Sequence, residues 1–398
     1  MNLTIMPGKL QGKVRAIPSK SQAHRMLICA AFADGPTFLN CPETNRDIDA
    51  TAQCLSALGA RITRSPEGFG VTPIQDVPKS AVLSCQDSGS TLRFLLPVAG
   101  ALGCDATFLL TGRLPQRPLS PLWEELERMG CHLSRPTENT VRCQGRLQAG
   151  IYKIDGGVSS QFITGLLLAL ALVPGESRLT VLGKLESAPY VNMTQQVMAL
   201  FGKNTAGLAV SGGRFHSPGK QWVEGDWSNA AFFLAAKALG SDVQMENLDL
   251  ESAQGDRACF TLLPELVKET QSICAADIPD LVPILSVVAA AAHGAEFTNI
   301  HRLRLKESDR VEAVIHMLTA LGGKAEAVGD TLRVYGTGLT GGTVDSRNDH
   351  RIAMSAAIAS TVCSRSVTIL GAECTEKSYP SFFREFKKLG GSYEQHLR

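Results

Sequence analysis

The sequence predicts an α/β protein of two similar halves, each built from three copies of one supersecondary module. Three observations lead to this prediction. The chain has 398 residues, more than one hydrophobic core usually serves. Helical patterns alternate with short strand-like runs along its whole length. An apolar residue followed by Gly also recurs at a near-constant interval, each time between a helical pattern and a new strand.

The recurring pair marks helix ends, because Gly after a helix readily adopts the left-handed conformation that stops it. The pairs are Leu58-Gly59, Met129-Gly130, Phe201-Gly202, Leu321-Gly322 and Leu389-Gly390. The glycines are 71, 72, 120 and 68 residues apart, so the long interval indicates two modules, one with a degenerate helix end near 268–270. Chance is the alternative, since such helix ends are common, but the regular interval favours a repeat.

Strands and helices follow from local patterns. Enrichment in β-branched and apolar residues predicts strands over 106–110, 178–182 and 366–370. Apolar periodicity behind Ser, Asp or Asn caps predicts helices over 21–32, 47–58, 90–102, 160–173, 228–239, 279–293, 311–318 and 352–362.

Bulk composition excludes several classes of protein. Thirty-nine Lys and Arg against 38 Asp and Glu give a formal net charge of +1, so the chain lacks the broad positive field of duplex nucleic-acid binders. Eleven cysteines without a CxxC pair favour buried, reduced thiols over zinc or disulfides. The N-terminus has no signal-peptide pattern, and the longest apolar runs, 162–173 and 284–292, are too short to span a bilayer.

The stretch 299–310 carries the strongest local signal for chemistry. It sets four cations and two carboxylates within twelve residues, directly before a helix. Lys306 and Arg310 beside Glu307 suit the binding of an anion at a helix N-terminus while a carboxylate moves a proton. A solvated charged turn is the alternative, and it is the commoner fate of such runs.

Similar basic and hydroxyl-rich turns open other helices. They contain Lys20-Ser21 with Arg25, Ser88-Gly89-Ser90, Arg113 with Arg117, Ser159-Ser160-Gln161, and Ser187 with Tyr190. Such groups present cations, hydroxyls and backbone N–H groups to an anion, although capped helices with surface cations would look much the same.

The second half adds Asp280 before an apolar helix, Asp349-His350-Arg351 at another helix start, and Lys377. Partial burial of Asp280 could raise its pKa toward use as a general base. Basic helix entrances in both halves of a nearly neutral chain predict a cleft between two domains that binds a ligand with several anionic groups.

The ordered set of motifs resembles the EPSP synthase family of enolpyruvyl transferases over essentially the whole chain. The matching motifs are Lys20-Ser21 with Arg25, Ser88-Gly89-Ser90, Arg113 with Arg117-Pro118, Ser159-Ser160-Gln161, Val223-Glu224-Gly225-Asp226, Gly255-Asp256, Asp280, Lys306-Glu307-Ser308-Asp309-Arg310, Asp349-His350-Arg351 and Lys377. Each motif is weak alone, but ten in the right order are highly specific.

The resemblance implies an inside-out α/β barrel fold with two domains, each of three βαβαββ units. One lobe would comprise residues 1–18 and 224–398 and clamp phosphoenolpyruvate; the other, residues 19–223, would hold shikimate 3-phosphate. The implied reaction transfers the enolpyruvyl group of phosphoenolpyruvate to the 5-hydroxyl of shikimate 3-phosphate and releases phosphate. This step belongs to the shikimate route to aromatic amino acids, and the resemblance implies a cytoplasmic enzyme, a monomer, that needs no metal or organic cofactor.

The resemblance also assigns roles to residues. The catalytic groups would be Asp280, Glu307 and Lys20. Shikimate 3-phosphate would contact Lys20, Ser21, Arg25, Ser159, Ser160, Gln161, Ser187, Tyr190, Asp280 and Lys306. Phosphoenolpyruvate would contact Lys20, Gly89, Arg113, Gln161, Arg310, Arg351 and Lys377. Gly89 stands where a larger residue would crowd phosphoenolpyruvate, which implies ordinary sensitivity to glyphosate.

Two departures from the family pattern are visible: Asp87 stands where many members carry Asn, and Arg302 where some carry an Asn that contacts the sugar. The related enolpyruvyl transferase that uses a UDP-sugar is the nearest alternative. Its reactive loop cysteine has no counterpart among residues 112–118. A catalytically silent anion-binding protein is the other alternative, but pure polyanion binding gains nothing from two carboxylates facing the ligand.

Overall fold

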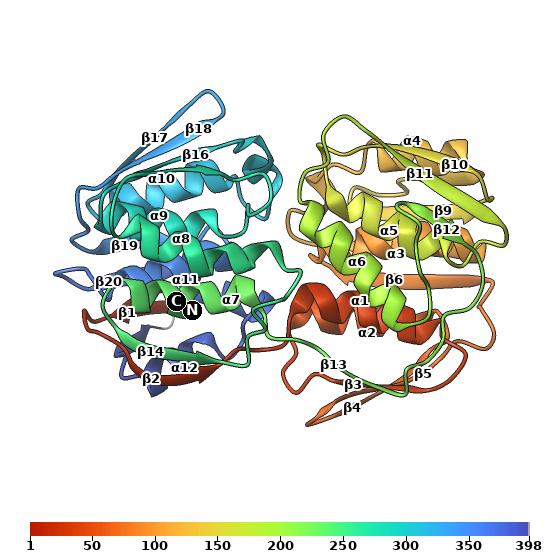
Figure 1. Cartoon of the computed structure of the whole chain (residues 1–398), viewed down its shortest axis with the longest axis horizontal. Helices are drawn as coiled ribbons and strands as arrows, with labels where there is room; N and C mark the ends of the chain where they lie inside the picture. The colour runs from red at the N-terminus through yellow and green to blue at the C-terminus, as the bar shows by residue number, and fades with distance from the viewer. Residues whose placement is uncertain (397–398) are drawn as a thin grey trace. The chain divides into compact units, whose positions relative to one another are not determined.

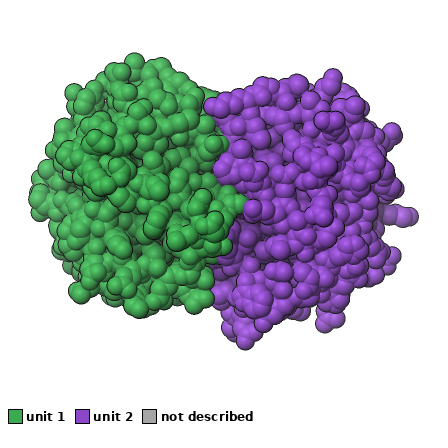
Figure 2. Space-filling view, viewed as in Figure 1, with its two compact units in different colours: residues 1–17, 225–398 green, residues 18–224 purple. Residues whose placement is uncertain are grey.

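The computed structural model describes residues 1–396, which divide into two compact units (Figures 1 and 2). Unit 1 contains residues 1–17 and 225–396, and unit 2 contains Pro18–Glu224. The chain thus begins in unit 1, builds unit 2 and returns to unit 1. Within the described residues each unit holds three small sheets.

One sheet of unit 2 shows the repeated module in full. Its elements are β6 (Ser80–Gln86), α3 (Gly89–Leu102), β7 (Asp105–Leu110), α4 (Leu122–Arg128), β8 (Cys131–Ser134) and β9 (Thr140–Gly145). The strand order is β6-β7-β9-β8, with β6 and β7 parallel and the other pairs antiparallel. This is the βαβαββ arrangement that the resemblance implied.

The other two sheets of unit 2 are variants of this module. The first uses α1 (Lys20–Ala31), β3 (Thr37–Asn40), α2 (Arg46–Ala57), β4 (Arg61–Ser65), β5 (Gly68–Thr72) and β13 (Lys220–Trp222), in the order β13-β3-β5-β4. The second uses β10 (Ile151–Asp155), α5 (Ser160–Leu170), β11 (Glu176–Leu182), α6 (Ala188–Leu200) and β12 (Ala209–Ser211). A short 3-10 turn, η1 (Leu114–Gln116), follows β7.

Unit 1 repeats the pattern. One sheet has the order β15-β16-β18-β17, from β15 (Gln271–Cys274), α9 (Val282–Ala291), β16 (Ala295–Thr298), α10 (Arg310–Ala320), β17 (Lys324–Val328) and β18 (Thr331–Tyr335). A second has the order β19-β20-β1-β21, from β19 (Gly342–Asp345), α11 (His350–Ala359), β20 (Val367–Leu370), α12 (Phe382–Lys388), β21 (Tyr393–His396) and β1 (Asn2–Ile5). The N-terminal strand therefore completes the last module.

The third sheet of unit 1 explains the long glycine interval. It pairs only β2 (Gln11–Arg15) with β14 (Asp242–Glu246), and α7 (Trp227–Ala238) precedes β14. The 3-10 turn η2 (Gly255–Ala258) and α8 (Cys259–Leu266) then lead directly into β15. In this module α8 is followed directly by β15, the first strand of the next sheet, and residues 267–270 between them contain no Gly, so the Leu-Gly helix end is missing there.

The glycines that mark the helix ends all have positive φ, between 74° at Gly202 and 110° at Gly130. A Cβ at Gly130 would also lie 2.6 Å from the carbonyl oxygen of Arg146. All five positions therefore favour Gly for conformation, and Gly130 requires it for space as well, which confirms the helix stops predicted from the sequence.

Each unit has its own hydrophobic core. In Figure 1 the helices α3 and α5 of unit 2 lie among its other elements, and nearly all of their residues are buried. A Cβ at Gly165 of α5 would lie 2.1 Å from the carbonyl oxygen of Arg93 on α3, so Gly165 lets these two helices pack closely. No helix within residues 1–396 is long and apolar enough to cross a membrane.

The expected helix over 279–293 begins later than predicted. The structure starts α9 at Val282, and residues 279–281 form a turn before it. Pro283 lies in the first turn of α9, where its missing N–H costs no helical hydrogen bond. The difference matters for function, because it leaves Asp280 in the turn and not on the helix.

Candidate active site

Arg310 organises a buried charge cluster in unit 1. It is the first residue of α10, and Asp309 caps that helix. The guanidinium is only 1% exposed. Its Nη1 donates to Asp280 Oδ1 at 2.5 Å, its Nη2 to Glu307 Oε2 at 2.9 Å, and its Nε to Asp349 Oδ2 at 2.9 Å. One arginine thus fixes three carboxylates that come from different segments of the chain.

Asp280 is held by three cations. Besides Arg310, Lys306 Nζ lies 3.2 Å from its Oδ1 and Arg351 Nη2 lies 3.8 Å from its Oδ2. Burial raises the pKa of Asp280, but Lys306, Arg310 and Arg351 outweigh it and lower the pKa well below the ordinary value. The prediction of a raised pKa for Asp280 is therefore wrong, because no single stretch of sequence reveals cations from separate segments.

The pKa of Lys306 is lowered overall, and burial is the largest cause. Burial lowers its pKa, Asp280 raises it, and the nearby guanidinium groups of Arg310 and Arg302 lower it again, so the net shift is downward. Arg302 is itself buried, and its Nη1 donates to the carbonyl oxygen of Ala276 at 3.4 Å. The family departure at Arg302 therefore adds a positive charge beside Lys306.

Arg351 lies at the start of α11, which Asp349 caps. Its Nη1 donates to the carbonyl oxygen of Ser228 on α7 at 2.7 Å, and its guanidinium lies over the ring of Phe232. Lys377 is also buried, at the end of η4 (Ala372–Lys377). The unit 1 cluster thus gathers side chains that follow β15, β16 and β19.

Exposure separates two layers within this cluster. Arg310 and Asp349 are buried, whereas the side chains of Asp280, Glu307 and Lys306 are 23%, 17% and 20% exposed. The accessible layer therefore offers two carboxylates and an ammonium to a ligand. Carboxylates can accept or deliver protons, and the cations can hold anionic groups.

Arg25 is a buried cation in unit 2. It is 2% exposed, and it hydrogen-bonds only oxygens of uncharged groups: Thr194 Oγ1, Thr164 Oγ1 and the carbonyl oxygens of Ser21 and Tyr190. Burial lowers its pKa to about 10. A buried cation without a carboxylate within ion-pair distance in the described chain is costly unless a ligand anion neutralises it.

Lys20, the first residue of α1, pairs with a carboxylate that sequence reasoning did not single out. Its Nζ lies 2.8 Å from Asp47 Oδ2, and the Asp47 side chain is only 4% exposed. Ser19 caps α1 by accepting a hydrogen bond from the backbone N–H of Gln22. The hydroxyl of Ser21 is therefore not the helix cap. Lys20 and Ser21 therefore open the helix that carries Arg25.

Gln161 connects α5 to α3. Its side-chain amide donates to Ser90 Oγ at 2.9 Å and accepts from Arg93 Nη1 at 2.9 Å. Arg93 is buried and also donates to the carbonyl oxygen of Pro118. A Cβ at Gly89 would lie 2.8 Å from Nη1 of both Arg93 and Arg117. Gly89 thus leaves room for two guanidinium groups at the start of α3.

The hydroxyl residues of unit 2 open its helices as expected. Ser159 caps α5 by accepting from the N–H of Gln161, and Ser160 is buried at the first helical position. Ser187 precedes α6 and has a left-handed backbone conformation, with φ at 56°. The carbonyl oxygen of Tyr190 accepts a hydrogen bond from Arg25 Nη2. Arg113, in contrast, is exposed at the start of η1.

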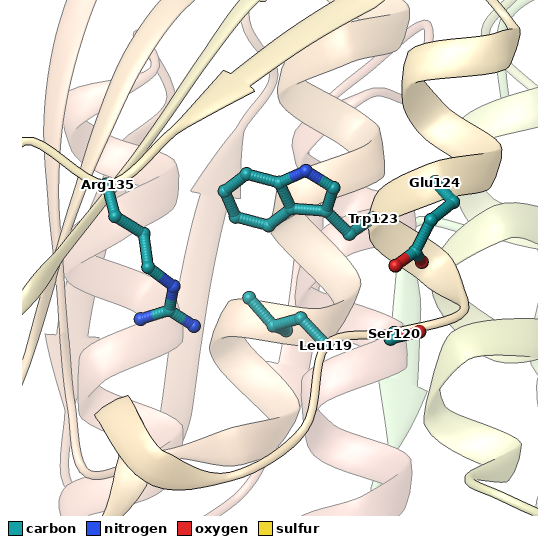
Figure 3. A pocket seen from close by; sticks show the side chains of 5 residues that line it. All are labelled: Leu119, Ser120, Trp123, Glu124 and Arg135. Carbon is teal, nitrogen blue, oxygen red and sulfur yellow. The ribbon is translucent and has the colours of Figure 1, made fainter.

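A shallow hollow of about 440 Å³ lies behind the Arg113–Arg117 loop, lined by Leu119, Ser120, Trp123, Glu124 and Arg135 (Figure 3). Arg135 lies over the Trp123 ring, with 5.8 Å between its Cζ and the ring centroid, and its Nη1 donates to the carbonyl oxygen of Pro115 at 3.3 Å. Arg135 therefore connects the Trp123 ring to the loop that contains Pro115.

Comparison with known proteins identifies the family. The family model of EPSP synthase (3-phosphoshikimate 1-carboxyvinyltransferase) matches residues 5–386. The chain belongs to the EPSP synthase family. Among relatives named 3-phosphoshikimate 1-carboxyvinyltransferase, that of Clostridium beijerinckii is 36% identical over 99% of this chain and 98% of its own. That of Clostridium perfringens is 38% identical over 97% and 98%.

Solved structures agree with the EPSP synthase fold. Two structures of EPSP synthase from Acinetobacter baumannii superpose with a TM-score of 0.79, at 25% and 24% identity, and cover 99% and 100% of this chain. The two-domain α/β fold expected from the sequence is therefore confirmed, as is the family resemblance.

Four buried residues of this EPSP synthase family member were not assigned roles from the sequence. They are Asp47, Arg93, Ser228 and Asp349. Asp349 lay inside the quoted motif Asp349-His350-Arg351. Arg93 follows Ser88-Gly89-Ser90 by three residues, and its charge one turn from the helix start could have singled it out. Asp47 and Ser228 gave no signal beyond their place in the first turns of helices, because their partners are 27 and 123 residues away.

Proposed function

We propose that this chain transfers the enolpyruvyl group of phosphoenolpyruvate to the 5-hydroxyl of shikimate 3-phosphate, with Asp280 and Glu307 as the proton-transferring groups of unit 1 and Arg25 as an anion-binding group of unit 2. The observation that carries the proposal is the attachment of two accessible carboxylates, Asp280 and Glu307, to one buried guanidinium. Family membership supports the same reaction.

In the proposed reaction the substrate hydroxyl oxygen adds to carbon 2 of phosphoenolpyruvate, and its proton passes to Asp280. Glu307, with Lys20, protonates the methylene carbon, which gives a tetrahedral intermediate. The carbon–oxygen bond to phosphate then breaks while a methyl proton returns to the protein, and the enol ether forms. The departing phosphate takes up the proton that Asp280 accepted, and Glu307 recovers its proton from the methyl group, so both carboxylates end in their starting protonation states.

Asp280 suits the role of base because it is ionised at neutral pH. In the free protein its pKa is low because Lys306, Arg310 and Arg351 surround it. Substrate phosphate and carboxylate groups would share these cations, which raises the pKa of Asp280 toward that of an effective base. Bringing several anions together is repulsive, and preorganised cations offset that repulsion and stabilise the charged transition state.

Arg25 supports the assignment of unit 2 to the phosphate of shikimate 3-phosphate, together with Ser159, Ser160 and Ser187. Its burial among hydroxyl and carbonyl oxygens is expected of a site completed by a ligand anion. Arg351, Arg310, Lys377, Arg113 and Gly89 would hold phosphoenolpyruvate. We further propose a monomer that works in the cytoplasm.

The test is to mix purified protein with phosphoenolpyruvate and either shikimate 3-phosphate or UDP-N-acetylglucosamine, and to measure phosphate release. The proposal predicts release with the former alone. Release only with the UDP-sugar would assign the chain to the related enolpyruvyl transferase, and binding of both substrates without release would indicate a silent anion-binding relative.

A further inference from the structure

Two side-chain contacts join α1 to α2, one helical turn apart. The first is the pair of Lys20 with Asp47, with 2.8 Å between Nζ and Oδ2. The second is the contact of His24 Nδ1 with Thr51 Oγ1 at 2.7 Å. Lys20 and His24 are four residues apart on α1, as are Asp47 and Thr51 on α2, so each set lies on one face of its helix. The contact of His24 with Thr51 therefore lies next to the Lys20–Asp47 pair, one turn further along both helices.

A third helix, α3, joins this arrangement through Thr91. The Thr91 hydroxyl lies 2.7 Å from Thr51 Oγ1 and donates to Ser88 Oγ at 2.8 Å. Ser88 is the N-cap of α3 and directly precedes Gly89, which is proposed to contact phosphoenolpyruvate. His24, Thr51, Thr91 and Ser88 are all 0% exposed. The contacts therefore form a continuous buried chain from α1 through α2 to the start of α3.

The direction of the hydrogen bonds in this chain follows from the single proton of each hydroxyl. Thr91 donates its proton to Ser88 Oγ, and the carbonyl oxygen of Asp47 is a longer acceptor at 3.4 Å. Thr91 can therefore only accept from Thr51. Because Thr51 has then used its own proton, it accepts from His24. Nδ1 of His24 must therefore carry a proton, and this one direction satisfies all three contacts.

A purely structural role is the alternative, since buried hydroxyls commonly satisfy one another. The location of the chain favours a role in the site. One end lies beside the Lys20–Asp47 pair, and the other lies at the turn that contains Gly89. Arg25, by contrast, is held by hydroxyls of α5 and α6. The chain therefore bears on the proposed phosphoenolpyruvate contacts of unit 2 more than on Arg25.

We propose that His24, Thr51 and Thr91 are positioning residues that hold the start of α3, with Gly89, in place relative to Lys20, and that the affinity for phosphoenolpyruvate depends on them. This inference rests on the proposed function, which gives Lys20 and Gly89 contacts with that substrate. The three positioning residues act through the helix starts and touch neither substrate. A misplacement of about 1 Å at such a site can cost about 10²-fold in rate, so a buried chain of fixed contacts suits this role.

Thr51→Val is the central test, because Val keeps the shape of Thr and replaces its hydroxyl with a methyl group. Steady-state phosphate release should show KM for phosphoenolpyruvate raised about tenfold and KM for shikimate 3-phosphate changed by less than about threefold. Thr51→Ser keeps the hydroxyl and should return KM for phosphoenolpyruvate to within about twofold of wild type. An unchanged KM in Thr51→Val, or equal impairment in Thr51→Ser, would overturn the proposal.

Thr37→Val is the matched control in the same unit. Thr37 lies on β3, is 2% exposed, and its hydroxyl contacts Ser217 Oγ at 2.8 Å. Thr37→Val and Thr51→Val should both lose stability in urea unfolding, because each removes one hydroxyl from a hydrogen-bonded contact. Only Thr51→Val should raise KM for phosphoenolpyruvate. An equal rise in Thr37→Val would assign Thr51 a general structural role and contradict the proposal.

A double variant, Thr51→Val with Thr91→Val, tests whether the two hydroxyls act as one chain. Either change alone breaks the connection between His24 and Ser88, so the second change should add little. We expect KM for phosphoenolpyruvate in the double variant to lie within about twofold of the more impaired single variant. A KM that multiplies the two single effects would mean that the hydroxyls act independently, against the proposal.

Nitrogen-15 NMR of the histidine rings separates this inference from the proposed reaction, because it needs no substrate. The chain predicts a proton on Nδ1 of His24 at neutral pH in wild type, and His24→Asn identifies the signal by its loss. Thr51→Val removes the acceptor, so the Nδ1 proton should exchange with water faster there. The wild-type measurement stands even if Thr51→Val does not fold.

The two kinds of failure then differ. Nδ1 of His24 without a proton in wild type overturns the inference even in an active enzyme. A protonated Nδ1 in a protein that releases no phosphate from phosphoenolpyruvate and shikimate 3-phosphate faults only the proposed function.

Discussion

Arg310 Nη1 lies 2.5 Å from Asp280 Oδ1, and Arg310 Nη2 lies 2.9 Å from Glu307 Oε2. Two carboxylates that are 27 residues apart in sequence are therefore held by the two terminal nitrogens of one side chain. Because Arg310 is buried and both carboxylates are partly exposed, the guanidinium positions groups that a substrate can reach. Arg310 thus positions the two carboxylates, and Asp280 and Glu307 are the groups that can react. These separate roles can be tested by substitution.

Asp280→Asn and Glu307→Gln should impair turnover far more than binding. Each replacement keeps the side-chain shape and removes the ability to accept or deliver a proton at neutral pH. We expect turnover to fall by about 10²-fold or more while the Kd for shikimate 3-phosphate changes by less than about tenfold. Steady-state phosphate release and titration calorimetry measure the two quantities. Equal losses in both would mean that these carboxylates bind substrate and do not catalyse.

Gly89→Ala should weaken the binding of phosphoenolpyruvate. The added Cβ would lie 2.8 Å from Nη1 of Arg93 and of Arg117, so both guanidinium groups must shift. We expect KM for phosphoenolpyruvate to rise about tenfold or more, with a smaller change in KM for shikimate 3-phosphate. Gly35→Ala is the matched control, since its Cβ would meet only an ordinary contact at 3.8 Å. An unchanged KM in Gly89→Ala would remove Gly89 from the binding site.

Arg25→Ala should act on the other substrate. Arg25 is the buried cation of unit 2 that no carboxylate neutralises within the described residues. Its removal should weaken shikimate 3-phosphate binding by about 10²-fold, because a buried phosphate would lose a charge-assisted contact. Arg61→Ala, at an exposed position on β4, is the control. Direct binding of shikimate 3-phosphate measures the effect, and equal affinities in the two variants would contradict the assignment.

Acid should destabilise the protein partly through Asp280. Its pKa is lower in the folded protein than in the unfolded chain, so its contribution is present above about pH 4 and is lost as pH falls through the folded-state value. Urea unfolding at pH 7, 4 and 3 should show a larger loss for wild type than for Asp280→Asn. Parallel losses would mean that the surrounding cations do not stabilise the ionised Asp280.

Local patterns predicted the helix ends because a positive φ at Gly59, Gly130 or Gly322 depends on neighbouring residues alone. The sequence predicted the repeated module but not which strands pair. For example, β1 pairs with β20 and β21, which lie more than 360 residues away in the sequence. The sequence predicted a degenerate helix end near 268–270, and α8 ends at Leu266 without a glycine, but the pairing of β14 with β2 in that module required the structure.

The site was predictable to the extent that its residues lie at helix starts. Lys306, Glu307 and Arg310 are neighbours in sequence, so their shared role could be inferred. The pKa of Asp280 could not, because it is lowered by Lys306 and Arg310, which follow a different strand, and by Arg351, which comes from another module. Likewise the pairing of Lys20 with Asp47 and the contact of Arg351 with Ser228 join separate helices.

The most direct measurement follows carbon-13 from phosphoenolpyruvate labelled at carbon 2 by NMR, after mixing with purified protein and shikimate 3-phosphate. The account predicts that the label appears in an enol ether on the 5-oxygen of shikimate 3-phosphate, with one phosphate released per ether formed. Label that stays in phosphoenolpyruvate, or that appears in free pyruvate as phosphate is released, would contradict it.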